Sequence, residues 1–122
     1  MHIIIGGAYA GKREHADRSY PEAEWINAGG KRPPKADVTI VTGCSAWLRS
    51  GHTSADVIDW LETLSDQTCV VVIIEEMGNG IVPADAGDRR LRDENGRLAQ
   101  KLVKAAETVD YVWHGLVKRK KP

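Results

Sequence analysis

The chain has 122 residues, of which 42% are hydrophobic and 28% charged, and its 17 Lys and Arg residues balance 17 Asp and Glu residues. These totals predict one globular domain, and the balanced charge favours neither a nucleic acid nor a membrane surface as partner. No apolar stretch approaches the roughly 18 residues of a membrane span, and the N-terminus has no signal-peptide pattern. We expect Cys44 and Cys69 to be reduced and buried, and the protein to be cytoplasmic.

Three short apolar runs predict buried parallel strands, because they are continuous rather than alternating. They span residues 3–5, 38–41 and 69–74. The third is the clearest, since its five successive β-branched residues are unfavourable in a helix. Residues 25–27 are a candidate for a further short strand.

Helical patterns separate these runs. Residues 12–19 predict a short polar helix, and Thr53 with Asp56 forms a capping box that predicts the start of a second helix. The apolar side of this second helix is formed by Val57, Ile58, Trp60, Leu61 and Leu64. Residues 85–109 predict the longest helix, in which Gly96 costs about 1 kcal/mol relative to Ala. Either a close backbone approach or simple tolerance explains that glycine. The apolar stripe of the longest helix consists of Leu91, Leu98, Leu102, Ala106 and Val109.

The C-terminal segment predicts a hairpin, with residues 111–113 and 116–118 flanking the turn His114-Gly115. Residues 27–36 predict a loop within the domain, and the chain shows no internal repeat. The basic run 118–121 is interpreted as a solvated chain end.

A glycine-rich loop carries the most specific pattern. It follows an apolar strand, precedes a helical segment, and has four residues between its first glycine and a Gly-Lys pair, as a phosphate-binding loop requires. Backbone N–H groups, the helix N-terminus and the lysine would surround the phosphates of a purine nucleotide. A glycine-rich turn that binds no ligand remains the alternative. The predicted nucleotide-binding residues are Gly6, Gly7, Ala8, Tyr9, Ala10, Gly11, Lys12 and Arg13.

The order of elements around this loop predicts an α/β fold like that of P-loop NTPases. Its sheet would be mostly parallel, with helices on both faces and the C-terminal antiparallel hairpin at one edge. Residues 1–122 then form a single nucleotide-binding domain.

Two carboxylates, Glu75 and Glu76, end the third buried strand, where open α/β sheets bind their ligands. Residues 77–83 follow with the sequence Met-Gly-Asn-Gly-Ile-Val-Pro. From spacing alone, exposed strand-end charges are the simpler interpretation of the two glutamates.

Three blocks resemble the family of bifunctional adenosylcobinamide kinases and adenosylcobinamide-phosphate guanylyltransferases. Residues 76–83 match Glu-x-Gly-x-Gly-Ile-Val-Pro of that family. Residues 92–100 match its Arg-Asp-x-x-Gly-Arg-x-Asn-Gln helix, with Ala99 in place of Asn. Residues 6–16 resemble Gly-Gly-Ala-Arg-Ser-Gly-Lys-Ser-x-His-Ala.

The resemblance implies that residues 6–12 bind the phosphates of ATP or GTP and that Glu76 is an acidic site residue, so Lys12 and Glu76 are the predicted catalytic pair. It also explains Gly96 as part of a family block. Family members phosphorylate the side-chain hydroxyl of adenosylcobinamide and then attach GMP, in cobalamin biosynthesis. A corrinoid is therefore the implied second substrate.

The chain departs from the family at three places. Arg13 replaces the Ser whose hydroxyl would bind Mg²⁺, and Gly43 stands where the family has Glu before Cys, so any Mg²⁺ would be weakly held. The family's insert with the guanylylated His is missing, since no His occurs between His15 and His52. We interpret His15 as a helix residue packing near the loop, His52 as solvated, and His2 and His114 as having no role in catalysis.

These departures leave three functions open: a kinase without the transferase half, a non-catalytic or regulatory nucleotide-binding protein, and a remnant that binds nothing. The first is favoured, because an intact site is easier to explain if a nucleotide still binds. The sequence does not determine whether ATP or GTP is preferred, or whether the chains form a homo-oligomer.

Overall fold

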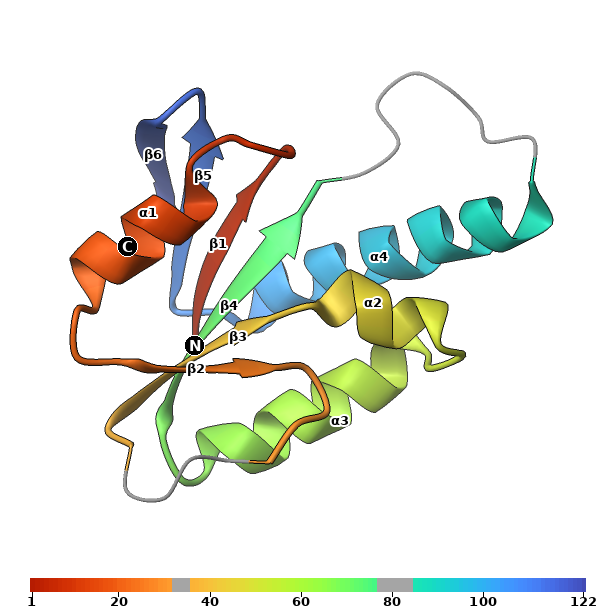
Figure 1. Ribbon diagram of the computed structural model, residues 1–122, viewed down its shortest axis with the longest axis horizontal. Coiled ribbons are helices and arrows are strands. Elements are labelled where there is room, and N and C mark those ends of the chain that lie inside the picture. The colour runs from red at the N-terminus through yellow and green to blue at the C-terminus, as the bar shows by residue number, and fades with distance from the viewer. Residues whose placement is uncertain (32–35, 77–84) are drawn as a thin grey trace.

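The computed structural model describes residues 1–31, 36–76 and 85–122, and shows a six-stranded sheet in the order β2-β3-β4-β1-β5-β6 (Figure 1). Every neighbouring pair of strands is parallel except β5 and β6, which are antiparallel. The elements are β1 (His2–Gly6), α1 (Lys12–Ser19), β2 (Glu24–Asn27), β3 (Val38–Thr42), α2 (Cys44–Arg49), α3 (Ser54–Ser65), β4 (Cys69–Glu75), α4 (Ala86–Ala105), β5 (Thr108–Trp113) and β6 (Leu116–Lys121). The predicted α/β class is confirmed.

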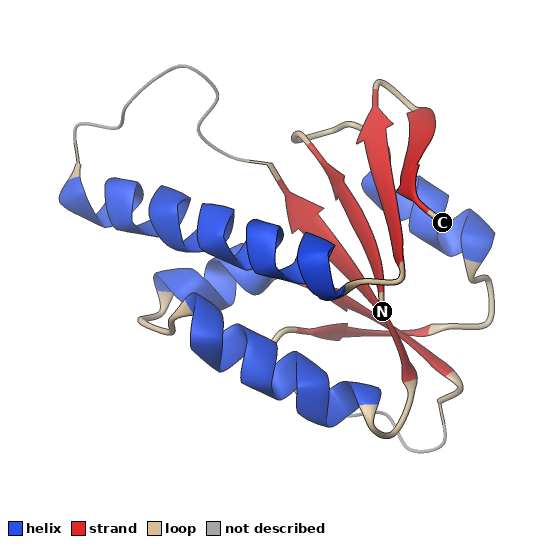
Figure 2. Cartoon of the chain, turned by 180° about the vertical axis from the view of Figure 1, so that it is seen from behind, coloured by secondary structure: helices blue, strands red, loops and turns tan. Residues whose placement is uncertain are grey.

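Helices cover both faces of the sheet, as Figures 1 and 2 show. Helix α1 packs on one face, where Ala16 joins a small apolar cluster with Ile4, Ile73 and Val112. Helices α2, α3 and α4 pack on the other face and contribute most of the larger core. The buried core residues that these three helices contribute are Cys44, Leu48, Val57, Leu61, Leu64, Leu91, Leu98 and Leu102.

The three predicted buried strands are neighbours in the sheet, as expected. Strand β4 lies between β3 and β1, and its residues 70–74 are buried on both faces, which explains their continuous apolar character. The candidate strand at residues 25–27 is β2, at the sheet edge. The prediction for Cys69 is wrong, because this thiol is exposed at the first residue of β4, whereas Cys44 is buried; both are free thiols.

The helices agree with prediction except at two places. Helix α2 was not predicted, since its six residues are too few for an apolar periodicity. Helix α4 ends at Ala105 rather than at residue 109, and Val109 pairs with Ile3 in strand β5. Val109 fits the helical spacing of the apolar stripe in the sequence, although it packs into the same core from strand β5.

Local capping and turn signals are confirmed. Thr53 and Asp56 exchange the two hydrogen bonds of a capping box at the start of α3. The β5–β6 turn has positive φ at both central residues, 47° at His114 and 77° at Gly115, as a two-residue hairpin requires.

Replacing Gly96 with Ala is expected to stabilise the protein by about 0.5–1 kcal/mol in chemical denaturation, because Ala is the better helix former. A Cβ built at Gly96 meets no atom within 4 Å among the described residues, so the close backbone approach considered above is not found. Gly6→Ala serves as the contrasting control, because its Cβ would lie 2.3 Å from the carbonyl oxygen of Val112. A destabilised Gly96→Ala variant would contradict this assignment.

Candidate functional site

The predicted phosphate-binding loop connects β1 to α1 at the carboxyl edge of the sheet. Gly11 is the N-cap of α1 with φ 99°, and its lack of a capping side chain leaves the first N–H groups of the helix available to a ligand. Tyr9 is fully exposed and adopts φ 58°, which is uncommon outside glycine. The loop is attached to the β5–β6 turn through the bond that Gly115 N donates to Ala10 O, at 2.8 Å.

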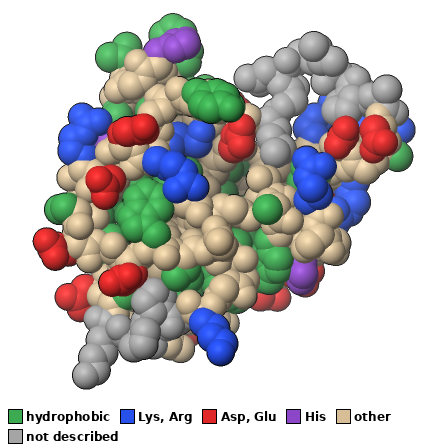
Figure 3. All heavy atoms as spheres, viewed as in Figure 1, with side chains coloured by type: hydrophobic (Ala, Val, Ile, Leu, Met, Phe, Trp, Pro, Cys, Tyr) green, Lys and Arg blue, Asp and Glu red, His purple; other side chains and the backbone are tan. Residues whose placement is uncertain are grey.

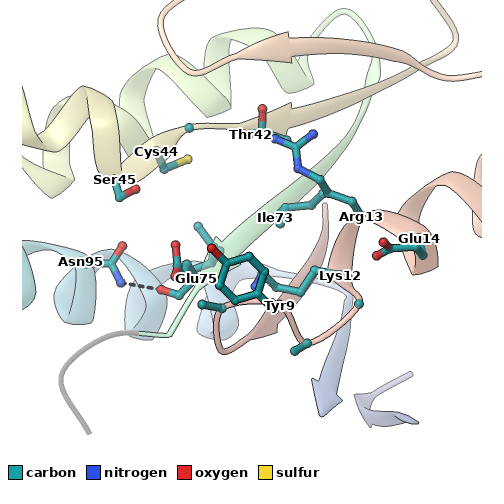
Figure 4. A pocket seen from close by; sticks show the side chains of 15 residues that line it. Tyr9, Lys12, Arg13, Glu14, Thr42, Cys44, Ser45, Ile73, Glu75 and Asn95 are labelled. Atoms are coloured by element: carbon teal, nitrogen blue, oxygen red, sulfur yellow. Dashed lines mark hydrogen bonds between the residues drawn. The ribbon is translucent and has the colours of Figure 1, made fainter. Parts of the chain in front are cut away.

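A cavity of about 500 Å³ opens beside this loop. Figure 4 shows the side chains that line it. Its walls come from the loop residues 8–11, the ends of β3 and β4, the starts of α1 and α2, and Asn95 of α4. This is the edge at which an open α/β sheet binds its ligands. The polar side chains that line it are Tyr9, Lys12, Arg13, Glu14, Thr42, Ser45, Glu75 and Asn95.

Lys12 is the first residue of α1 and extends back along the loop. Its Nζ donates a hydrogen bond to the carbonyl oxygen of Gly7. Burial lowers the pKa of Lys12, and the neighbouring Glu75 carboxylate opposes that shift. An ammonium group beside open backbone N–H groups is the arrangement that attracts polyphosphate.

Arg13 lies at the cavity wall on the side of β3. Its guanidinium carbon is 5.6 Å from the centre of the Trp25 ring, within the range of a cation–π contact. Figure 4 shows the side chain extending toward Thr42. Arg13 therefore adds a second cation to the cavity, at the position where a phosphate-binding loop ordinarily has a metal-binding hydroxyl.

The two strand-end glutamates occupy different places. Glu75 lines the cavity, whereas Glu76 does not and instead accepts a hydrogen bond from the Tyr111 hydroxyl at 2.7 Å. That bond raises the pKa of Tyr111. The structure thus places Lys12 with Glu75 rather than with the predicted Glu76. Residues 77–83, which carry the glycines of the signature, lie outside the described residues.

Asn95 is a site residue that the sequence analysis did not single out. It is 3% exposed, and its Nδ2 donates to the backbone oxygen of Glu75 at 2.8 Å, which ties α4 to the end of β4. A polar residue inside the apolar stripe of α4 was the available signal.

The backbone conformation at Gly43 favours glycine. It has φ 75° and caps α2, and an added Cβ would lie 3.4 Å from Oδ1 of Asn27. A glutamate here would be strained by that φ value. Burial raises the pKa of the next residue, Cys44, to about 12, so its thiol stays protonated at neutral pH.

A buried polar cluster lies under α1, away from the cavity. Oδ2 of Asp110 is 2.8 Å from both His2 Nε2 and His15 Nε2, and Arg119 Nε donates to Asp110 Oδ1 at 2.8 Å. The Asp110 side chain is fully buried. His15 is a residue of helix α1, as expected, and its side chain belongs to this cluster. His2, interpreted above as having no role in catalysis, joins it there. His52 is only partly solvated, since its ring lies 4.6 Å from that of Trp47, centre to centre.

Acidification is expected to destabilise the protein through this cluster. Burial lowers the pKa of His2 below its ordinary 6.5, so the unfolded chain binds the proton more readily than the folded chain. Stability from this group is therefore complete above pH 6.5 and is lost as pH falls below it. Thermal unfolding in EDTA should show that the melting temperature of the parent falls as pH is lowered from about 7.5 to 5. It should fall less for His2→Gln than for the parent. Equal slopes for both proteins would contradict this assignment.

Among the described residues, no helix is both long and apolar enough to cross a membrane. Acidic and basic side chains are interspersed over the face shown in Figure 3, in keeping with their equal numbers in the sequence.

Comparison with known proteins supports the resemblance. The sequence profile of the cobinamide kinase / cobinamide phosphate guanyltransferase family matches residues 36–119, from just before β3 to the end region of β6. The match covers about two thirds of the chain and leaves out the loop at residues 6–13. No individual curated protein matches. The extent of the profile match shows that this chain belongs to the cobinamide kinase / cobinamide phosphate guanyltransferase family.

Proposed function

We propose that the protein binds ATP or GTP through residues 6–13 and transfers the terminal phosphoryl group to a side-chain hydroxyl of a corrinoid. One observation supports this most: the open N-terminus of α1, Lys12 and Glu75 share one cavity at the carboxyl edge of the sheet. Phosphoryl transfer depends mainly on positioning and charge neutralisation, which these groups can supply.

In this proposal each residue has a limited task. The backbone N–H groups of the loop and the Lys12 ammonium hold the phosphates, and Arg13 adds positive charge from the β3 side. Glu75 is the acceptor within the cavity for the proton of the attacking hydroxyl, and Asn95 positions it by holding the Glu75 carbonyl. Glu76 supports the same strand end through Tyr111.

The donors that face the cavity suit Mg²⁺ in part. Carboxylate, hydroxyl and amide oxygens are its preferred ligands, and Glu75, Ser45 and Asn95 offer them here. Because Arg13 stands where such a loop usually has Ser or Thr, that hydroxyl ligand is missing, and the charge of Arg13 repels a cation. When bound, Mg²⁺ would neutralise charge on the phosphates, a task that Arg13 takes over in part.

Arg13→Ser is expected to make nucleotide affinity depend more strongly on Mg²⁺. Arginine has no acceptor atom but can hold a phosphate directly, whereas serine provides a metal ligand. Isothermal titration of ATP and GTP, with Mg²⁺ or EDTA, measures the difference. The parent should gain less than about tenfold from Mg²⁺, about 1.4 kcal/mol, and Arg13→Ser should gain more. A larger gain in the parent, or no change in the variant, would refute the role given to Arg13.

A non-catalytic nucleotide-binding protein is the second candidate. The absence of an acidic side chain at Gly43 and of a hydroxyl at Arg13 favours it. The two candidates differ in turnover, which a coupled assay with a cobinamide acceptor measures. Nucleotide binding without product formation would favour the second candidate, and absence of binding would exclude both.

We further propose that guanylyl transfer is lost. The cavity is lined by no histidine among the described residues, and His15 is engaged with Asp110. Incubation with labelled GTP followed by denaturing electrophoresis should leave the chain unlabelled. A stable GMP adduct on His15 or His52 would overturn this part of the proposal.

A further inference from the structure

The cluster under α1 brings three metal-ligating side chains together from separate elements. His2 belongs to β1, His15 to α1 and Asp110 to β5, and one ligand atom from each lies within 4.8 Å of the others. We propose that these three residues bind one divalent transition-metal ion of the Zn²⁺ type. The site is separate from the nucleotide cavity, whose lining residues include none of the three.

The donor set selects the class of ion. Two imidazole nitrogens and one carboxylate oxygen suit Zn²⁺ and its transition-metal neighbours, whereas Mg²⁺ and Ca²⁺ prefer oxygen alone. Two ligands of a tetrahedral Zn²⁺ lie roughly 3.4 Å apart, given bond lengths of about 2.1 Å. Both His–Asp contacts are 2.8 Å, so each must lengthen by about 0.6 Å to admit the ion.

The surrounding groups resemble the outer partners of a metal site. Nδ1 of His2 lies 2.6 Å from the Tyr20 hydroxyl, so it can donate there when Nε2 binds metal. Arg119 Nε holds Oδ1 of Asp110 at 2.8 Å and so orients Oδ2 toward the histidines.

Two features oppose metal binding: the charge of Arg119 and the hydrogen bonds that the cluster can form without metal. Arg119 carries a positive charge and its Nη2 lies 3.2 Å from Oδ2 of Asp110, the oxygen that would bind metal. The Arg119 side chain is 58% exposed, so solvent screens much of its charge. The exposed guanidinium also has room to move away from the ion. Without metal, N–H groups of both histidines can donate to Asp110, and this network is the alternative that the experiment must distinguish.

The test uses the full chain, stripped with EDTA and kept free of nucleotide, so its outcome is independent of the proposed kinase function. Equilibrium dialysis against Zn²⁺ should give one bound equivalent, and Co²⁺ substitution should give visible ligand-field absorption typical of nitrogen and oxygen ligands. His15→Gln should weaken Zn²⁺ binding about 100-fold or more, at least as much as losing an outer partner. His15 suits substitution because its side chain is partly exposed.

Two control variants test other metal donors. His114→Gln and Cys69→Ser change an exposed imidazole and an exposed thiol outside the cluster, and both should bind as the parent does. The proposal is overturned if the parent takes up no Zn²⁺, if His15→Gln binds as tightly as the parent, or if Cys69→Ser abolishes binding. The Co²⁺ spectrum of the parent decides the matter even if His15→Gln fails to fold.

Discussion

Lys12→Ala is expected to weaken ATP and GTP binding about 100-fold, equivalent to about 2.8 kcal/mol. Lys12 is the one compact cation on the loop itself, and its ammonium group would lose charge-assisted bonds to the phosphates. Isothermal titration measures the affinities. The fold should survive, since the side chain bonds only to the carbonyl of Gly7 among the contacts described.

Lys101→Ala is the matched control for this experiment. Lys101 is exposed on α4 and lies outside the cavity lining, so its removal should leave the affinities unchanged. If Lys12→Ala binds both nucleotides as tightly as the parent, the phosphate-binding function of the loop is wrong. A parent that binds neither nucleotide would refute the proposed function as a whole.

Asp110→Asn is expected to lower the free energy of unfolding by about 3 kcal/mol. Burial alone would raise the pKa of Asp110, but hydrogen bonds from Arg119, His15 and His2 outweigh burial and keep this carboxylate ionised. Asparagine keeps the shape but not the charge, and its NH₂ group cannot accept the bonds that a carboxylate oxygen accepts. Urea denaturation in EDTA measures the change without any contribution from bound metal.

Asp17→Asn provides the control for charge alone. Asp17 is exposed on α1, and its substitution should change stability by less than about 0.5 kcal/mol. A loss below about 1 kcal/mol for Asp110→Asn would show that the cluster contributes little to stability.

Much of the fold follows from local signals in the sequence. The β-branched run 70–74, the capping box at Thr53 and the turn at His114 each depend on residues within a few positions of one another. Steric and hydrogen-bonding preferences of single residues are enough to determine such features. The glycine-rich loop and the bounds of α1 follow in the same way, since a strand, a loop and a helix succeed one another directly.

The details of the site depended on the tertiary structure. The alternating side chains of β4 and its neighbours decide that Glu75 enters the cavity and Glu76 meets Tyr111, and spacing along one strand cannot reveal this. The apolar stripe in the sequence could not show that α4 ends before Val109. Val109 would face the same core whether it belonged to the helix or, as observed, to β5.

The sequence by itself determined the class of fold, its three central strands and the phosphate-binding pattern of the loop. Only the tertiary structure brought His2 and His15 onto Asp110, which lies 108 and 95 residues away from them. The pairing of β1 with β5, and the packing of α1 over both, create that contact. Contacts of this kind arise from the assembled sheet, because local patterns carry no record of which distant strand becomes a neighbour.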